Sequence, residues 1–295
     1  MADGSSGSTV PRRQLGRYLR ELRNKARLTV KAAAETLEWS EAKMWRIETG
    51  QTSLRSHDVE TMCRVYGAGS DLTGALMALA KETKAKGWWH SYGDVIPTWL
   101  DVYISLQEAA TALSVYQSEL VPGLLQTDAY ARTLIGSDNP GVNEQEIERR
   151  VQLRIERQAL LTRVTDPPGV GIVLNEAVIR RPIGSQKIMA DQLAHLLEVG
   201  ELPNLAVRVI PFAHGMHYGV MSGAFAMLEF PINGMGMPIE PTTIYIEGYA
   251  GALYLDKPHE VERYEQAFNH IKSASLSEAA SRKFIADVVK EWRSE

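Results

Sequence analysis

Side chains suited to contacting nucleic acid are concentrated between residues 27 and 55. Lysine and arginine neutralise backbone phosphates, and an arginine can make a bidentate contact to guanine that is worth about 1–3 kcal/mol of discrimination. Arg46 is the candidate for such a base contact, whereas the other basic residues of this segment are expected at phosphates. With the helix-capping residues beside them, the expected DNA-binding residues are Arg27, Thr29, Lys31, Ser40, Glu41, Ala42, Lys43, Trp45, Arg46 and Arg55.

Three short amphipathic segments would hold these side chains in place. Leucines at helical spacing predict a helix over residues 14–23. Thr29 can cap a helix over residues 30–37, and Ser40 can cap another over residues 41–49. A short helix, a turn and a second short helix form the helix-turn-helix pattern, which is typical of DNA-binding proteins.

Two residues of the third helix leave its mode of contact open. Met44 and Ile47 are expected to face the core, which directs Glu41 and Trp45 outward. Glu41 can accept a hydrogen bond from cytosine, or it can serve only the positive end of the helix. Trp45 can pack on a thymine methyl group or against a neighbouring domain. These alternatives separate a sequence-reading helix from one that contacts a protein.

The same segment resembles the Xre-type, lambda-repressor-like helix-turn-helix regulators. The resemblance implies about five helices, of which the third enters the major groove. It also implies a structural ion pair between Arg23 and Glu48 that positions the third helix without reading bases. The residues that carry it are Leu28-Thr29, Ala33, Leu37, Ser40, Met44 and Arg46-Ile47-Glu48-Thr49-Gly50.

The chain is expected to contain two folded domains. We predict a disordered tail over residues 1–10, a five-helix all-α domain over 11–85, an aromatic linker over 86–104 and an α+β domain over 105–295. The later helices of the first domain should cover residues 57–66, capped by Ser56 or Asp58, and 71–84. Cys63, the single cysteine, is interpreted as a core thiol.

The larger domain mixes helical and strand-like patterns, so the fold class is α+β. Strands are predicted over residues 170–174, 205–210, 224–230 and 242–247, and helices over 127–135, 144–163, 185–199, 258–273 and from 277 onward. This region resembles a domain of unassigned function found in actinobacterial antitoxin-like regulators, through residues 88–100, 118–131, 148–151 and 175–182. The resemblance implies a small partner protein encoded nearby.

A binding role is favoured over catalysis in the larger domain. His214 and His217 are two candidate metal ligands without an identified carboxylate or cysteine partner, so no metal and no cofactor are expected. The segment lacks a phosphate-binding glycine motif and a nucleophile elbow, and we expect no enzyme activity. Phe212, His214, His217 and Tyr218 form a candidate pocket for a small-molecule effector.

The distribution of charge also separates a DNA-binding first domain from the larger second domain. Residues 11–67 carry a net charge of +5, while the whole chain carries −4 and the remainder therefore −9. A basic head on an acidic body suits contact with double-stranded DNA at one end. No segment predicts a membrane span or a signal peptide, so we expect a cytoplasmic protein. Because a single head offers few base contacts, we also expect a homodimer that reads two half-sites. The alternative function is an antitoxin-like adaptor that acts by protein–protein binding.

Overall fold

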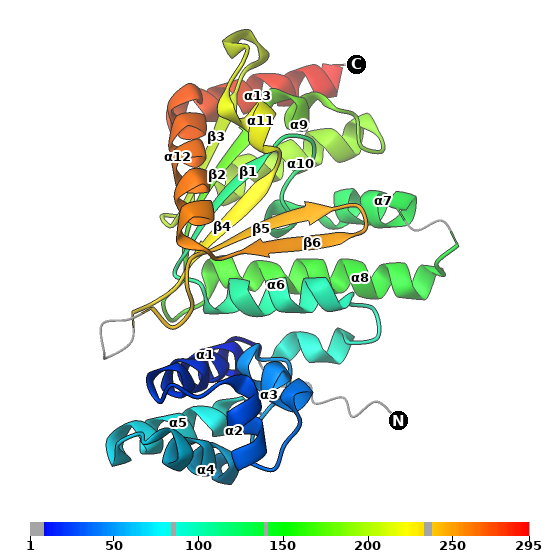
Figure 1. Ribbon diagram of the computed structural model, residues 1–295. Coiled ribbons are helices and arrows are strands. Elements are labelled where there is room, and N and C mark those ends of the chain that lie inside the picture. The colour runs from blue at the N-terminus through cyan, green and yellow to red at the C-terminus, as the bar shows by residue number, and fades with distance from the viewer. Residues whose placement is uncertain (1–8, 84–86, 139–140, 233–237, 295) are drawn as a thin grey trace. The chain divides into compact units, whose positions relative to one another are not determined.

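The computed structural model describes residues 9–83, 87–138, 141–232 and 238–294 (Figure 1). It divides into two compact units. The first contains the chain up to Ser91 together with residues 104–109, and the second contains residues 92–103 and the chain from Ala110 onward, so helix α6 (Thr98–Ala109) is shared between them. The segment expected as a linker is largely helical, because it contains the 3-10 turn η1 (Trp88–Tyr92) and the first half of α6. Each unit is described by itself.

The first unit is a small bundle of helices, in agreement with the predicted all-α domain. Its core is formed by inward-facing leucine, methionine and valine side chains, and Cys63 lies fully buried among them. Burial raises the pKa of this thiol, as expected for a residue that packs rather than reacts. The helices are α1 (Thr9–Lys25), α2 (Val30–Thr36), α3 (Glu41–Glu48), α4 (Ser56–Tyr66) and α5 (Ser70–Glu82).

Helix α1 begins earlier than the sequence indicated. Thr9 and Val10 are helical instead of forming part of a tail, and residues 1–8 of that expected tail lie outside the described residues. Val10 is buried, and its N–H donates to the Ser105 hydroxyl at 3.3 Å. A long-range partner of this kind extends the helix, and periodicity in the local sequence does not reveal it.

Local capping residues set the ends of α2 and α3 as predicted. The Thr29 hydroxyl accepts from the Ala32 N–H at 3.1 Å, and the Ser40 hydroxyl accepts from the Lys43 N–H at 3.2 Å. Gly50 follows α3 with a φ of +72°, a conformation that glycine adopts without strain.

The predicted cap of α4 is wrong. Neither Ser56 nor Asp58 caps this helix, because Ser56 is already its first residue and its hydroxyl donates to the Met77 carbonyl instead. Arg55 occupies the capping position and makes no side-chain cap. The serine is used to hold α4 against α5, which is a tertiary contact.

The second unit contains a six-stranded sheet, as the α+β prediction requires. The strand order is β3-β2-β1-β4-β5-β6, with β1, β2 and β3 parallel and the other pairs antiparallel. Strands β1 and β6 were not predicted from the sequence. The strands are β1 (Ala112–Gln117), β2 (Gly169–Asn175), β3 (Leu205–Ile210), β4 (Phe225–Glu229), β5 (Thr243–Gly248) and β6 (Gly251–Leu255).

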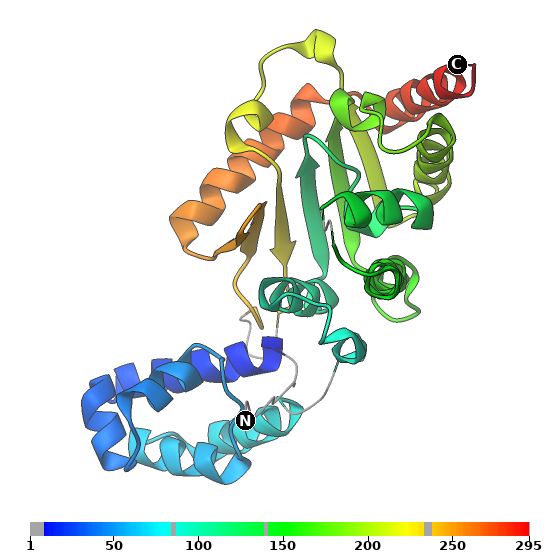
Figure 2. The same cartoon turned by 90° about the vertical axis from the view of Figure 1, so that its right-hand side faces the viewer.

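Helices cover both faces of this sheet (Figure 2). On one face, buried residues of α12, including Phe268 and Ile271, pack against Tyr116, Phe225 and Ile244 of the sheet. On the other face lie α7, α8 and α10, while α13 packs against α10 and the outer strand β3. The helices are α7 (Asp128–Asp138), α8 (Glu144–Glu156), α9 (Glu176–Arg180), α10 (Gln186–Val199), α11 (Tyr218–Ser222), α12 (Pro258–Ala274) and α13 (Glu278–Ser294).

The long helix predicted over residues 144–163 is shorter in the structure. Helix α8 ends at Glu156, and the chain continues as the 3-10 turn η3 (Arg157–Thr162). Two further 3-10 turns, η2 (Gly123–Leu125) and η4 (Phe212–His214), occur in the connections of this unit. Residues 157, 160 and 161 are buried, so packing draws this turn into the domain although its sequence suits a helix.

Candidate DNA-binding site

Helix α3 presents one buried face and one exposed face. Met44 and Ile47 are almost completely buried in the core of the first unit. On the opposite face Glu41, Ala42 and Arg46 are exposed, and the Trp45 side chain is 56% exposed. The outer face of α3 is therefore polar, with one aromatic side chain at its centre.

The basic residues expected at phosphates are exposed on neighbouring segments of the chain. Lys31 is exposed on the first turn of α2, and Arg55 is exposed immediately before α4. Arg27 is exposed in the turn after α1, with a φ of +57°. All three cationic side chains are therefore accessible to solvent.

Lys43 has a contact that the sequence did not indicate. Its ammonium group lies 3.4 Å from the centre of the Trp39 indole ring. A cation over an aromatic face is held electrostatically, and the ammonium keeps its remaining N–H groups for an anion. The four-residue separation between Trp39 and Lys43 is the only sequence signal for this pair, and it is weak because Trp39 precedes the helix.

The ion pair implied by the resemblance is present. Arg23 donates from Nε to Glu48 Oε1 at 2.6 Å and from Nη2 to Oε2 at 2.8 Å. Its third donor, Nη1, reaches the Leu28 carbonyl at 2.8 Å. Both side chains are less than a tenth exposed, and the hydrogen bonds that Arg23 donates to Glu48 raise the pKa of Arg23. The guanidinium thus joins α1, the turn before α2 and the end of α3.

Gly16 allows α1 to approach α3 closely. A Cβ atom at Gly16 would lie 2.5 Å from the Ile47 carbonyl oxygen and 2.9 Å from that of Glu48. Such distances are shorter than van der Waals contact, so no larger residue fits without moving one helix. The orientation of α3 therefore depends on this glycine and on the Arg23–Glu48 pair.

The expected effector pocket of the second unit has a different character in the structure. Phe212, His214 and Tyr218 are exposed on η4 and α11, and with Met216 and Met221 they form an apolar surface. The Tyr218 ring stacks on His270 of α12. In the sequence, this surface is indicated by the absence of Lys, Arg, Asp and Glu between Arg208 and Glu229.

His217 is buried, unlike its neighbours. Its Nδ1 accepts from the Gly219 N–H at 3.1 Å, and its Nε2 lies 3.5 Å from the Asn175 amide nitrogen. Burial and the nearby His214 lower the pKa of His217, so the ring is neutral near pH 7. Within the described ranges, no three histidine, cysteine or acidic side chains are grouped as a metal site would require.

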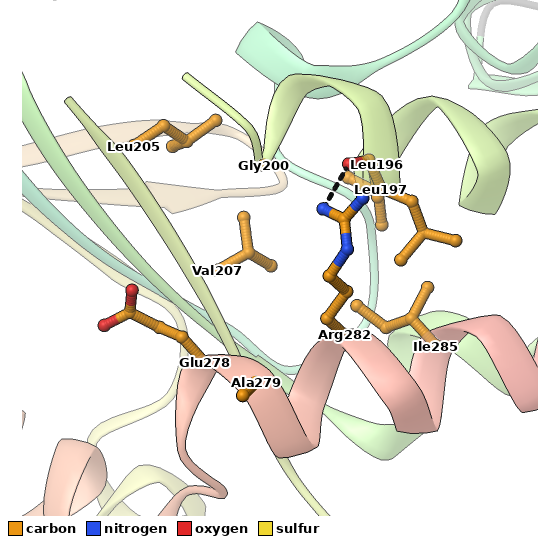
Figure 3. Close-up of a pocket in the computed structure, with 9 residues that line it drawn as sticks. All are labelled: Leu196, Leu197, Gly200, Leu205, Val207, Glu278, Ala279, Arg282 and Ile285. Atoms are coloured by element: carbon orange, nitrogen blue, oxygen red, sulfur yellow. Dashed lines mark hydrogen bonds between the residues drawn. The ribbon is translucent and has the colours of Figure 1, made fainter. Parts of the chain in front are cut away.

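A cavity of 140 Å³ occurs elsewhere in the second unit, between α10, β3 and α13 (Figure 3). Leu196, Leu205, Val207 and Ile285 supply apolar walls, and Arg282 lies at its rim. None of the four residues expected to form a pocket contributes to this cavity.

The five helices and the exposed face of α3 define the first unit as a helix-turn-helix domain, the class of fold typical of DNA-binding regulators. A family profile for helix-turn-helix domains matches residues 14–76. A second profile, described as a domain of unknown function, DUF5753, matches residues 100–287, which is more than half of the chain. The chain belongs to this family. No curated protein and no solved structure matches the chain.

In the part of the chain that the structure describes, no helix is both long and apolar enough to cross a bilayer.

Proposed function

We propose that the chain is a sequence-specific transcriptional regulator of the Xre type. The observation that carries the proposal is the outer face of α3, on which Glu41, Trp45 and Arg46 are exposed to solvent. Arg46 reads guanine, while Lys31, Lys43 and Arg55 neutralise phosphates. The second unit binds a small partner protein or an effector and thereby changes DNA binding, without a catalytic step.

The proposed regulator acts in the cytoplasm as a homodimer. One helix-turn-helix domain makes few base contacts, and dimers of this fold read two half-sites about 34–36 Å apart. The second unit contributes the regulatory input because the first is occupied by its DNA contacts. Regulation in this sense requires that the partner bind the DNA-competent and DNA-incompetent states with different affinity.

The test is selection of DNA sequences from a random library by the full chain, followed by binding titrations. Arg46→Ala should relax specificity at one base position and cost about 1–3 kcal/mol at the selected site. Arg64→Ala is the matched control, because Arg64 is an exposed arginine on α4 that we assign no base contact. Equal loss in both variants would show that Arg46 contributes only charge.

An antitoxin-like adaptor is the second candidate. Glu41 at the start of α3 repels phosphate, and the 56% exposed indole of Trp45 suits a protein partner as well as a thymine methyl group. If the selection enriches no DNA sequence even at low salt, while Trp45→Ala abolishes binding to a partner protein, the adaptor function replaces the regulator.

A further inference from the structure

Five large apolar side chains are exposed within ten residues of the second unit, from η4 to α11. Their exposed fractions run from 54% to 77%, although apolar side chains of this size are usually buried. Single exposed apolar residues are common, whereas a cluster of them marks an interaction surface. We call these residues the η4–α11 surface: Phe212, Met216, Tyr218, Val220 and Met221.

The protein holds the η4–α11 surface in a fixed conformation. The Phe212 N–H donates to the buried carboxylate of Glu176 at 2.6 Å, and His217 within the segment is buried. The Tyr218 ring stacks on His270 of α12, with 4.4 Å between the ring centres and 8° between their planes. Helix α11 packs beside α12 (Figure 1). Because the surface is already ordered, a partner can bind it at a small cost in conformational entropy.

The area of the η4–α11 surface matches what a stable dimer needs. An aromatic side chain presents roughly 150–250 Å², so Phe212 and Tyr218, each more than half exposed, contribute about 200 Å² together. Met216, Val220 and Met221 are at least 60% exposed and raise the total to roughly 500 Å². Two copies of the surface therefore bury about 1,000 Å² against each other, which is the area that a specific interface requires.

The η4–α11 surface lacks charge in a chain that is otherwise rich in it. Residues 209–228 are the longest stretch without Lys, Arg, Asp or Glu, while the chain outside residues 11–67 carries a net charge of −9. At a two-fold axis each residue meets the equivalent region of its own copy, so a charge there faces a charge of the same sign. Like charges placed together across an interface strongly disfavour association. An acidic domain that pairs with itself therefore needs an uncharged surface, which a partner of different sequence does not require.

We propose that the η4–α11 surface is the interface through which two copies of the chain form the homodimer, about a two-fold axis that passes through this surface. The aromatic rings supply rigid contact area, and the methionine side chains adapt their shape to the facing copy. This inference rests on the proposed homodimer and names the residues that join its two chains.

Two other occupants fit the observations less well. A partner protein of different sequence would gain affinity from positive charge opposite an acidic domain, yet this surface offers it no carboxylate. A small apolar molecule would cover only part of an open surface of this size, because ligand sites enclose most of their ligand. A second copy of the chain accounts for both the area and the absence of charge.

Sedimentation velocity of the full chain without DNA measures the dimer directly. Met221→Lys places a charge at the most exposed side chain of the surface, which is 77% exposed, so the fold should tolerate it. Tyr249→Lys is the matched control, because Tyr249 is fully exposed in the turn between β5 and β6. We expect a wild-type dimer whose dissociation constant rises about hundredfold or more in Met221→Lys alone.

An exchange of charge tests whether the surface contacts a copy of itself. Met221→Glu should dissociate the dimer as Met221→Lys does, because each variant opposes like charges. A mixture of the two variants should recover a mixed dimer, since opposite charges then face each other across the axis. Sedimentation of fluorescently labelled Met221→Glu in an excess of Met221→Lys detects this species. A variant that had merely misfolded would not be rescued by the other.

The inference is overturned if the wild-type chain is monomeric at every concentration measured, if Tyr249→Lys weakens the dimer as much as Met221→Lys, or if the mixed variants remain monomeric. A monomeric wild-type chain that forms a defined complex with a different protein, lost in Met221→Lys, would overturn it in favour of a partner protein.

DNA binding is measured on the same proteins, so that the two proposals can fail separately. Monomeric Met221→Lys should bind a sequence with two half-sites more weakly but keep its Arg46-dependent preference for a single half-site. A wild-type dimer without sequence preference would contradict the regulator function and leave the interface intact. A wild-type monomer with Arg46-dependent specificity would contradict the interface alone.

Discussion

The Arg23 guanidinium donates two parallel hydrogen bonds to the Glu48 carboxylate, at 2.6 and 2.8 Å, across the interior of the helix-turn-helix domain. The two residues are 25 positions apart, and both are almost fully buried. Since Glu48 is the last residue of α3, the pair fixes the end of the helix whose outer face is proposed to contact DNA.

Removing one partner of this pair should destabilise the first unit strongly. Glu48→Leu leaves the Arg23 charge buried without compensation, which costs about 3–5 kcal/mol. Native-state hydrogen exchange of the α1 and α3 amides in the full chain measures the effect. The double variant Arg23→Met with Glu48→Leu should recover most of the loss because no unpaired charge remains. A double variant as unstable as Glu48→Leu would contradict the importance of charge compensation.

Gly16→Ala should disturb the same helix by a steric route. The added Cβ would lie 2.5 Å from the Ile47 carbonyl oxygen, so α1 and α3 must separate, at an expected cost of about 1–3 kcal/mol. DNA affinity should fall with it. Gly74→Ala in α5 is the control, because nothing lies within 4 Å of its Cβ position, and it should stabilise by about 0.5–1 kcal/mol. Thermal unfolding distinguishes the two, and equal effects would argue against the close approach.

Lys43 and Trp39 should have separable effects on DNA binding. Lys43→Ala is expected to weaken binding to all sequences and to reduce the salt slope by about one, because one phosphate contact is lost. Trp39→Leu removes the ring under the ammonium group and should weaken binding without changing that slope, since the charge stays. Titrations at several salt concentrations give both quantities. A change of slope in Trp39→Leu would show that the indole itself contributes to the ionic contact.

The stability of the second unit should fall in mild acid because of His217. Burial and His214 lower the pKa of His217 below its ordinary value of 6.5, so the unfolded chain binds the proton more readily than the folded one. The contribution is fully present above pH 6.5 and is lost as the pH falls below it. Urea unfolding followed by circular dichroism between pH 5 and 8 should show a shallower pH dependence in His217→Asn. His259→Asn, on the exposed surface of α12, is the matched control.

Much of the helix-turn-helix domain could be predicted because its signals are local. Thr29 and Ser40 cap the helices that follow them through bonds to the third residue along, and Gly50 ends α3 by adopting a positive φ. The outward face of α3 follows from the spacing of Met44 and Ile47 alone. In each case a few neighbouring residues contain the whole physical cause.

The second unit was less predictable because its decisive contacts are distant in sequence. Strand β1 lies between β2 and β4, so its identity depends on partners more than 50 residues away. Among the described residues, the short strand β6 pairs with β5 alone. Phe212 and Tyr218, which were expected to line a pocket, lie on an exposed surface. An apolar composition does not show whether side chains enclose a cavity or face the solvent.

By itself, the sequence determined the caps of α2 and α3, the helical periodicity and the charge division, because each arises within a few residues or from composition. Only the tertiary structure decided that Trp39 contacts Lys43, that Gly16 sets the spacing of α1 and α3, and that a cavity lies between α10, β3 and α13. Those features depend on distances between segments that are brought together by burial of apolar side chains, and no local pattern encodes such distances.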